Sequence, residues 1–253
     1  MPINYARSLT GHARTAAANR HLGFALAFVA GATNAGGFLA VQQYTSHMTG
    51  IVSSVADNLV LGSYAPVFAA LGAILSFLLG AACTAVMVNY VRRQRLYSEY
   101  ALPLLVEAIL LLAFGMLGAR LSAIEGLFLP FTVMLLCFIM GLQNAVITKI
   151  SHAEIRTTHM TGIVTDIGIE LGKLLYWNAD RGAGRPKVEA NRMRLKLLAG
   201  LLLAFFIGGV AGAVGFRHVG YLSTVPLAAL LCALAIVPTV DDMVRVFGRL
   251  RRG

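Results

Sequence analysis

The chain has 253 residues, of which 58% are hydrophobic and 13% are charged. Soluble domains carry roughly 25% charged residues, so the composition excludes an ordinary soluble domain and predicts a protein of the lipid bilayer. The net charge of +10 would fit nucleic-acid binding in a soluble protein. In a membrane protein, cytoplasmic loops rich in Lys and Arg explain this charge better, and we expect no nucleic-acid partner.

The apolar residues fall into segments of membrane-spanning length. Residues 1–20 are polar and basic, and we expect them to form a surface-lying or loosely attached tail. The expected spans, each close to the 20 or so residues that a helix needs to cross a bilayer, are 21–43, 65–91, 100–119, 127–148, 197–216 and 221–240. A basic tail over 241–253 follows. The prediction is an all-α protein with one membrane domain over residues 21–240.

Two polar segments interrupt this pattern and match each other. Asn34-Ala35 corresponds to Asn144-Ala145, and His47-Met48-Thr49-Gly50-Ile51-Val52 corresponds to His159-Met160-Thr161-Gly162-Ile163-Val164. The similarity extends to residues 76–85 and 204–213, and to residues 103–108 and 226–231. The chain is therefore predicted to contain two repeats, over 21–119 and 127–240, each with one polar segment between its first and second spans.

The placement of basic residues decides whether these polar segments cross the membrane. With six spans, Arg120 and Arg217 are the only ones of the 21 Lys and Arg that fall outside the cell. With eight spans, six of them would lie outside: Arg92, Arg93, Arg95, Lys149, Arg156 and Arg217. The positive-inside rule therefore favours six spans with both termini in the cytoplasm. Three spans per repeat is an odd number, so we expect inverted repeats, with broken or re-entrant polar segments entering from opposite sides.

These polar segments have two interpretations. In the first, Thr49 and Thr161 cap helices that begin inside the bilayer, whose positive ends suit an anion or a carbonyl oxygen. The residues of a substrate path would then be Asn34, His47, Thr49, Gly50, Asn144, His159, Thr161 and Gly162. In the second, the same amides and hydroxyls join helices by hydrogen bonds, and the glycines allow close packing. The leading hypothesis is transport or channelling of a small solute, at a site that the two motifs form together near the midplane of the membrane. The alternative is a non-transporting scaffold or sensor whose motifs are structural.

Three acidic residues are candidates for proton or ion coupling, because ionisable groups inside membranes are functional by default. Glu107 lies in the middle of a span with no charge nearby in sequence, and it is the better candidate. Its alternative role is a protonated acid bonded to a neighbouring helix. Asp166 and Glu170 share a helix face and repel each other, with partial relief from Lys173. Their alternative role is that of ordinary solvated charges near the cytoplasmic interface.

Other chemistry is not expected. Cys83, Cys137 and Cys232 lie in apolar runs without the spacing of disulfides or metal ligands, which is typical of packing residues. His47-Met48 and His159-Met160 each offer only two groups to a soft metal, so we expect no metal site. Hydrolase, metalloprotease, phosphate-loop and cofactor motifs do not occur in the sequence, and we expect neither enzymatic activity nor a cofactor.

The residues Gly141-Leu-Gln-Asn144-Ala145 and Arg156-Thr-Thr-His-Met-Thr161-Gly162 resemble the YoaK-type family of bacterial integral membrane proteins, a domain of unknown function. The resemblance covers about residues 21–240. It implies a multi-pass protein of the bacterial inner membrane with about six spans, and it brings no substrate or catalytic residue. Family members often have Thr-Gly-Asn in the first motif, where this chain has Ile51, which argues against a required amide there. From the size of the chain, a homodimer is a further expectation.

Overall fold

A computed structural model describes residues 16–94, 96, 98–121, 128–150, 160–178 and 187–250. Every regular element within these ranges is a helix. The elements are α2 (Ala16–Val41), α3 (Met48–Val60), α4 (Tyr64–Arg93), α5 (Ala101–Leu121), α6 (Phe128–Ile150), α7 (Met160–Leu175), α8 (Arg192–His218), the 3-10 helix η1 (Gly220–Ser223) and α9 (Thr224–Leu250).

Six of the described helices are long and apolar enough to cross a membrane, and they coincide with the predicted spans. They cover Ala17–Val41, Tyr64–Arg93, Ala101–Gly118, Leu129–Ile150, Arg192–His218 and Gly220–Val240. The helices α3 and α7 have 13 and 16 residues, fewer than the 17 or so that a span requires. The expectation of an all-α, multi-pass membrane protein is confirmed, and both polar segments contain a short helix.

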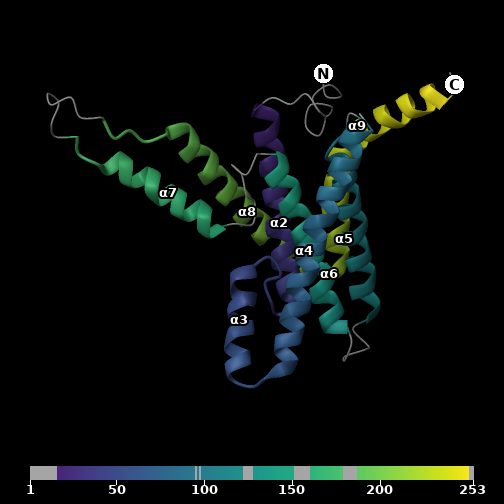
Figure 1. The fold of residues 1–253 in the computed structure, drawn as a ribbon, viewed down its shortest axis with the longest axis horizontal. Coiled ribbons are helices and arrows are strands. Elements are labelled where there is room, and N and C mark those ends of the chain that lie inside the picture. Colours follow the sequence, from purple (N-terminus) through teal and green to yellow (C-terminus); the bar gives the residue numbers. More distant parts are fainter. Residues whose placement is uncertain are drawn as a thin grey trace.

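The spanning helices stand side by side in one bundle, in which α2 packs mainly on α8, α4 on α6 and α5 on α9 (Figure 1). The start of α2 and the end of α9 lie at the same end of the bundle in Figure 1. At the opposite end, α3 and the first part of α4 form a projecting hairpin, whereas α7 and the first part of α8 extend sideways from the bundle. The two short helices therefore extend from the bundle in different directions (Figure 1).

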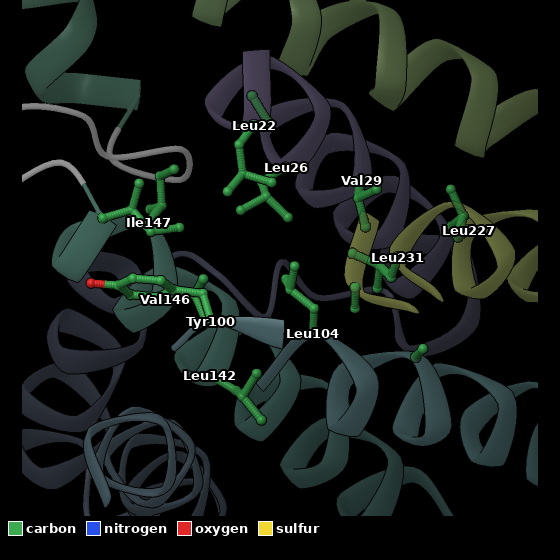
Figure 2. Packing of buried hydrophobic residues seen from close by; sticks show 14 of the residues in the cluster. Leu22, Leu26, Val29, Tyr100, Leu104, Leu142, Val146, Ile147, Leu227 and Leu231 are labelled. Atoms are coloured by element: carbon green, nitrogen blue, oxygen red, sulfur yellow. The ribbon is translucent and has the colours of Figure 1, made fainter. Parts of the chain in front are cut away.

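Large apolar side chains from several helices fill the centre of the bundle (Figure 2). Leu26 of α2, Leu104 of α5 and Leu142 of α6 are fully buried there. The outer faces of the spans are equally apolar: Leu78 of α4 and Phe206 of α8 are exposed in the isolated chain. Because these outer side chains cannot be covered by protein, they are suited to contact lipid.

Glycines allow α2 and α8 to touch backbone to backbone. A Cβ placed on Gly31 would overlap the carbonyl oxygen of Phe205, and a Cβ on Gly208 would overlap the carbonyl oxygen of Phe28. The two helices therefore approach more closely than any side chain would permit at these positions.

The helices α4 and α6 make the equivalent contact with the equivalent residues. A Cβ on Gly141 would overlap the carbonyl oxygen of Phe77, and a Cβ on Gly80 would overlap that of Phe138. In the alignment of the two halves, Gly141 corresponds to Gly31 and Gly80 corresponds to Gly208. The α2–α8 contact and the α4–α6 contact are thus the same arrangement, made twice.

The short helices also pack in equivalent ways. The inner face of α3 lies against α4, and the inner face of α7 lies against α8. The packed residues occupy matching positions, Met48, Ile51 and Val55 in α3 and Met160, Ile163 and Ile167 in α7. Each polar segment therefore presents the same apolar triplet to the helix that follows it.

We expect Gly141→Ala to lower the free energy of unfolding by about 2 kcal/mol, the usual size of an overpacking penalty, because its methyl group would push α6 away from α4. Gly72→Ala is the matched control, since a Cβ there would meet only the flexible Met134 side chain at 3.7 Å. Thermal unfolding in detergent micelles measures the difference. Equal unfolding midpoints for the two variants would contradict the role of the glycine contact.

Candidate functional site

The first polar segment folds back on the helix that precedes it. Gln42 adopts a left-handed backbone, with φ 53°, and its N–H donates to the carbonyl oxygen of Phe38 at 2.8 Å. The rings of Phe38 and Tyr44 stack with centroids 4.5 Å apart. This reversal brings Ser46 to α2, where its Oγ donates to Oδ1 of Asn34 at 2.8 Å. The side chain of Asn34 is thus held by its own repeat.

The His-Met-Thr-Gly motif forms the start of α3. The helix begins at Met48, and His47 is the N-cap residue, without a capping hydrogen bond from its side chain. A Cβ on Gly50 would overlap the imidazole of His47, so the ring lies over the first turn of the helix. Thr49 is inside the helix, and the prediction that it caps α3 was wrong. Both His47 and Thr49 are exposed, so neither side chain lies in the interior of the bundle.

The second motif is described from Met160 onward, and His159 lies outside the described residues. The helix α7 begins at Met160. Thr161 is exposed and Gly162 is half-buried. The carbonyl oxygen of Thr161 accepts a hydrogen bond from Thr165 Oγ1 at 2.8 Å. Thr161 therefore occupies the same position in its helix as Thr49 does in α3.

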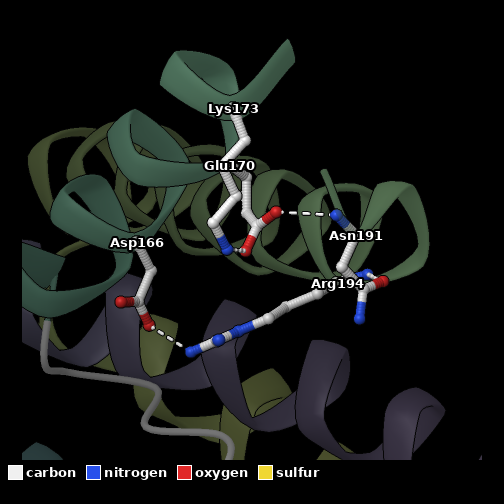
Figure 3. A network of polar contacts seen from close by, with 5 residues as sticks. All are labelled: Asp166, Glu170, Lys173, Asn191 and Arg194. Carbon is white, nitrogen blue, oxygen red and sulfur yellow. Dashed lines mark hydrogen bonds and ion pairs between the residues drawn. The ribbon is translucent and has the colours of Figure 1, made fainter. Parts of the chain in front are cut away.

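Asp166 and Glu170 fasten α7 to the start of α8 (Figure 3). Oδ2 of Asp166 accepts from Nη2 of Arg194 at 2.9 Å. Oε1 of Glu170 pairs with Nζ of Lys173 at 2.8 Å, and Oε2 accepts from the backbone N–H of Asn191 at 2.7 Å. Asn191 in turn caps α8, because its Oδ1 accepts from the N–H of Arg194 at 2.9 Å. We call these five residues the α7 clasp.

The α7 clasp has no counterpart in the first repeat among the described contacts. The positions that match Asp166 and Glu170 are Ser54 and Asn58, and Asn58 Nδ2 donates to the carbonyl oxygen of Ser54 within α3 at 2.8 Å. In the second repeat, the hydrogen bond from Lys173 and then that from the Asn191 N–H hold the pKa of Glu170 below its ordinary value. Both acids of α7 therefore have defined partners that serve helix docking.

Inside the bundle, α6 carries two amide side chains with unused oxygens. Gln143 is fully buried, and its Nε2 donates to the carbonyl oxygen of Leu26 in α2 at 3.1 Å. Because a carbonyl group only accepts hydrogen bonds, the amide nitrogen is fixed toward Leu26 and Oε1 points away from it. Within the described part of the chain, neither Oε1 of Gln143 nor the buried Oδ1 of Asn144 has a hydrogen-bond partner.

Glu107 of α5 lies at the same depth. Its side chain is fully buried, and neither carboxyl oxygen has a hydrogen-bond partner among the described residues. The hydroxyl of Tyr100 donates to the carbonyl oxygen of Lys149 at 3.3 Å, which aligns the start of α5 with the end of α6. Since these helices run antiparallel, seven residues at about 1.5 Å of rise each put Glu107 roughly level with Leu142 and Gln143 along the bundle axis. We call Glu107, Gln143 and Asn144 the acceptor layer.

Asn34 lies at a different depth. Gln143 is opposite Leu26, and a Cβ on Gly37 would contact Leu136. Asn34 is eight residues further along α2 than Leu26, which corresponds to about 12 Å along the helix axis. The structure therefore places Glu107 and Asn144 at one level and Asn34 at another, nearer the opposite end of the bundle.

A polar network closes the end of the bundle that lies nearest the acceptor layer. Nε of Arg92 donates to Oε2 of Glu99 at 3.0 Å, and Nη2 donates to the hydroxyl of Tyr100 at 2.9 Å. The N–H of Ser98 donates to Oδ2 of Asp242 at 2.7 Å, and its hydroxyl donates to the same oxygen. These contacts tie the α4–α5 turn to α9 and, through Tyr100, to α6.

The cysteines and the candidate metal ligands lie apart from these groups. Cys137 is buried between α3, α4 and α6, and Cys83 and Cys232 are half-buried free thiols. Within the described residues, His, Cys, Asp and Glu do not gather in any group of three or more that could hold a metal ion.

Sequence reasoning missed Gln143, Asn191 and Arg194. Gln143 could have been predicted, because an amide within an apolar span needs a hydrogen-bond partner. Gln143 also stands directly before the candidate residue Asn144. Asn191 and Arg194 gave no such signal, because their contacts with α7 depend on how α7 folds back on α8.

Six apolar spans around an interior with buried polar groups define a multi-pass helical membrane protein. Residues 22–237 match the family described as "Protein of unknown function (DUF1275)", and the chain belongs to this family. The expected membership of a family without an assigned function is thereby confirmed. No curated protein and no solved structure matches the chain.

Breaking the α7 clasp should release α7 from α8. The pKa of Glu170 is lower in the docked state than in a free chain, so its contribution is complete at neutral pH and is lost as the pH falls through the lowered value. We expect spin labels on Val164 and Ala199 to show a broadened distance distribution once the pH falls below the ordinary range of a glutamate carboxyl group.

In Glu170→Gln the broad distribution should already be present at pH 7, because a neutral amide oxygen accepts the N–H of Asn191 more weakly than a carboxylate oxygen does. Glu189→Gln, an exposed acid before α8, is the control and should keep the narrow distribution. A narrow distribution in Glu170→Gln at pH 7 would show that the clasp does not hold α7.

Proposed function

We propose that this protein is a transporter or channel for a small solute in the bacterial inner membrane, with both termini in the cytoplasm and no catalytic activity. The observation that carries the proposal is Glu107, a fully buried carboxyl group in a span, with neither oxygen bonded within the described residues. Burying a polar group without a hydrogen-bond partner lowers the free energy of unfolding by about 2–7 kcal/mol. An acid with a purely structural role would avoid this loss by bonding to a neighbouring group. Acids inside membranes mark solute and proton paths.

We further propose that the halves of the chain are inverted repeats, over 21–119 and 127–240. The duplicated glycine contacts support two equivalent units, and three spans per unit support inversion. Transporters built in this way bind their solutes near the interface of the two repeats. The acceptor layer fits that rule, because Glu107 belongs to the first repeat and Gln143 and Asn144 belong to the second.

The remaining residues take roles along this path. Asn144 and, at the other depth, Asn34 would line it, and Glu107 would exchange the coupling proton. The two short-helix starts, with residues His47, Thr49 and Gly50 and residues His159, Thr161 and Gly162, would shape its mouths. Asp166 and Glu170 would hold α7 beside the cytoplasmic mouth through the α7 clasp.

The alternative proposal is a scaffold or sensor that transports nothing. It is favoured by interhelical hydrogen bonds of the type that join membrane helices, such as Thr84 Oγ1 to the carbonyl oxygen of Leu142 at 2.9 Å. A transporter admits water to the acceptor layer, whereas a scaffold keeps it dry. Either proposal includes a homodimer. Either also includes kinship with the YoaK-type proteins, which is based on residues 141–145 and 156–162.

Water access is the first test. In a cysteine-free background, Asn144→Cys should react with a membrane-impermeant thiol reagent applied from the cytoplasmic side of inverted vesicles. Two controls should stay unreactive: Ile147→Cys, which is fully buried on the same helix, and Leu79→Cys, which is on the outer face of α4 and suited to lipid. Failure of Asn144→Cys to react from either side would favour the scaffold.

Topology is the second test. Ser53 on α3 and Thr165 on α7 are both exposed, and cysteines at these positions should react from opposite sides of the membrane. Ser53→Cys should be labelled in intact cells and Thr165→Cys in inverted vesicles. Labelling of both from one side would exclude the inverted arrangement.

A further inference from the structure

We infer that the acceptor layer binds a small monovalent cation, and this rests on the proposed transport role because it names the class of solute. The unused atoms of the layer are all oxygens: both carboxyl oxygens of Glu107, Oε1 of Gln143 and Oδ1 of Asn144. Oxygen atoms of this kind are satisfied by hydrogen-bond donors or by cations. A solute that itself only accepts hydrogen bonds would leave them unpaired.

The charge of the bundle interior also favours a cation. Glu107 is the one charged residue within the stretches 22–41, 64–91, 101–118, 129–148, 197–216 and 224–240, and the Lys and Arg of the spans stand at their ends. Charges interact strongly at low dielectric constant, so an ionised Glu107 would repel an anion and attract a cation. No basic side chain within these stretches competes for that place.

An anion has no equivalent site in the described chain. The positive helix ends that sequence analysis considered for an anion belong to α3 and α7. Their first-turn residues Thr49 and Thr161 are exposed, whereas Glu107 and Gln143 are fully buried. The motif residues that would favour an anion therefore lie apart from the buried groups that need a ligand.

One carboxylate and two amide oxygens suit a single positive charge. Calcium and magnesium ions take six or more oxygen ligands, and zinc prefers the nitrogen and sulfur atoms of His and Cys, neither of which this layer supplies. The ligand is therefore an alkali ion or a protonated amine, both of which offer one positive charge to oxygen atoms. A proton on Glu107 competes with that cation, so the proton leaves the carboxyl group as the cation arrives.

Equilibrium binding to the purified protein in detergent micelles tests the inference. The midpoint of thermal unfolding is measured at pH 8 with increasing sodium, potassium, ammonium or methylammonium chloride, at ionic strength held constant with N-methyl-D-glucamine chloride. A bound cation stabilises the folded state, so at least one of these salts should raise the midpoint saturably. Sodium or potassium alone would identify an alkali site, and ammonium or methylammonium alone would identify an amine site.

Single-residue variants test whether the cation binds at the acceptor layer. Glu107→Gln should weaken the apparent affinity at least about tenfold, which corresponds to the loss of one charged interaction, and Gln143→Leu should weaken it less. Glu189→Gln controls for the loss of an acid outside the layer, and Thr84→Val controls for the loss of a buried hydrogen bond next to it. Both controls should respond to the cation as the wild type does.

Three results would overturn the inference: no response to any of the four cations, an unchanged response in Glu107→Gln, or a response that follows the anion when the cation is fixed. This assay does not require transport. Cation binding with an unreactive Asn144→Cys would therefore refute the transport role alone, whereas a reactive Asn144→Cys without cation binding would refute only the class of solute.

Discussion

Direct contact between helix backbones at glycine determines the arrangement of this protein. Lipid gives membrane helices little hydrophobic reason to associate, so packing and small residues must supply it. Gly31 and Gly208 fix α2 against α8, and Gly80 and Gly141 fix α4 against α6. With these pairs fixed, the amides of α6 stand at a defined height beside α2 and α5. The hydrogen bonds from Gln143 to Leu26 and from Tyr100 to Lys149 set that height.

The duplication repeats the scaffold and the Asn and His-Met-Thr-Gly motifs, whereas the acidic candidates occur in single copies. Glu107 has an apolar residue, Leu230, at its matching position in the second half, and Asp166 and Glu170 have the uncharged Ser54 and Asn58 at theirs. The first repeat therefore supplies the buried carboxyl group and the second supplies the amides and the clasp. The proposed site therefore draws its groups from both halves of the chain.

The six spans could be predicted within a few residues, because length and hydropathy alone decide whether a helix can cross a bilayer. The duplicated motif likewise indicated two matching helix starts. The cap at Thr49 was predicted wrongly, since local pattern does not reveal that the ring of His47 lies over Gly50. The spacing did predict Lys173 as a partner of Glu170, which the structure confirms. The partner of Asp166 could not be predicted, because Arg194 follows it by 28 residues and only the folded chain brings the two together.

The two short helices differ in what determines their position. Residues 61–63 alone connect α3 to α4, so the covalent chain obliges this pair to move as one body. Residues 176–191 separate α7 from α8 in the sequence, and α7 is docked by its apolar triplet together with the charged pairs of the α7 clasp. Attraction between partly exposed charges weakens as electrolyte accumulates. The docking of α7 therefore includes a part that depends on the ionic composition of the adjoining solution, whereas α3 packs through apolar side chains.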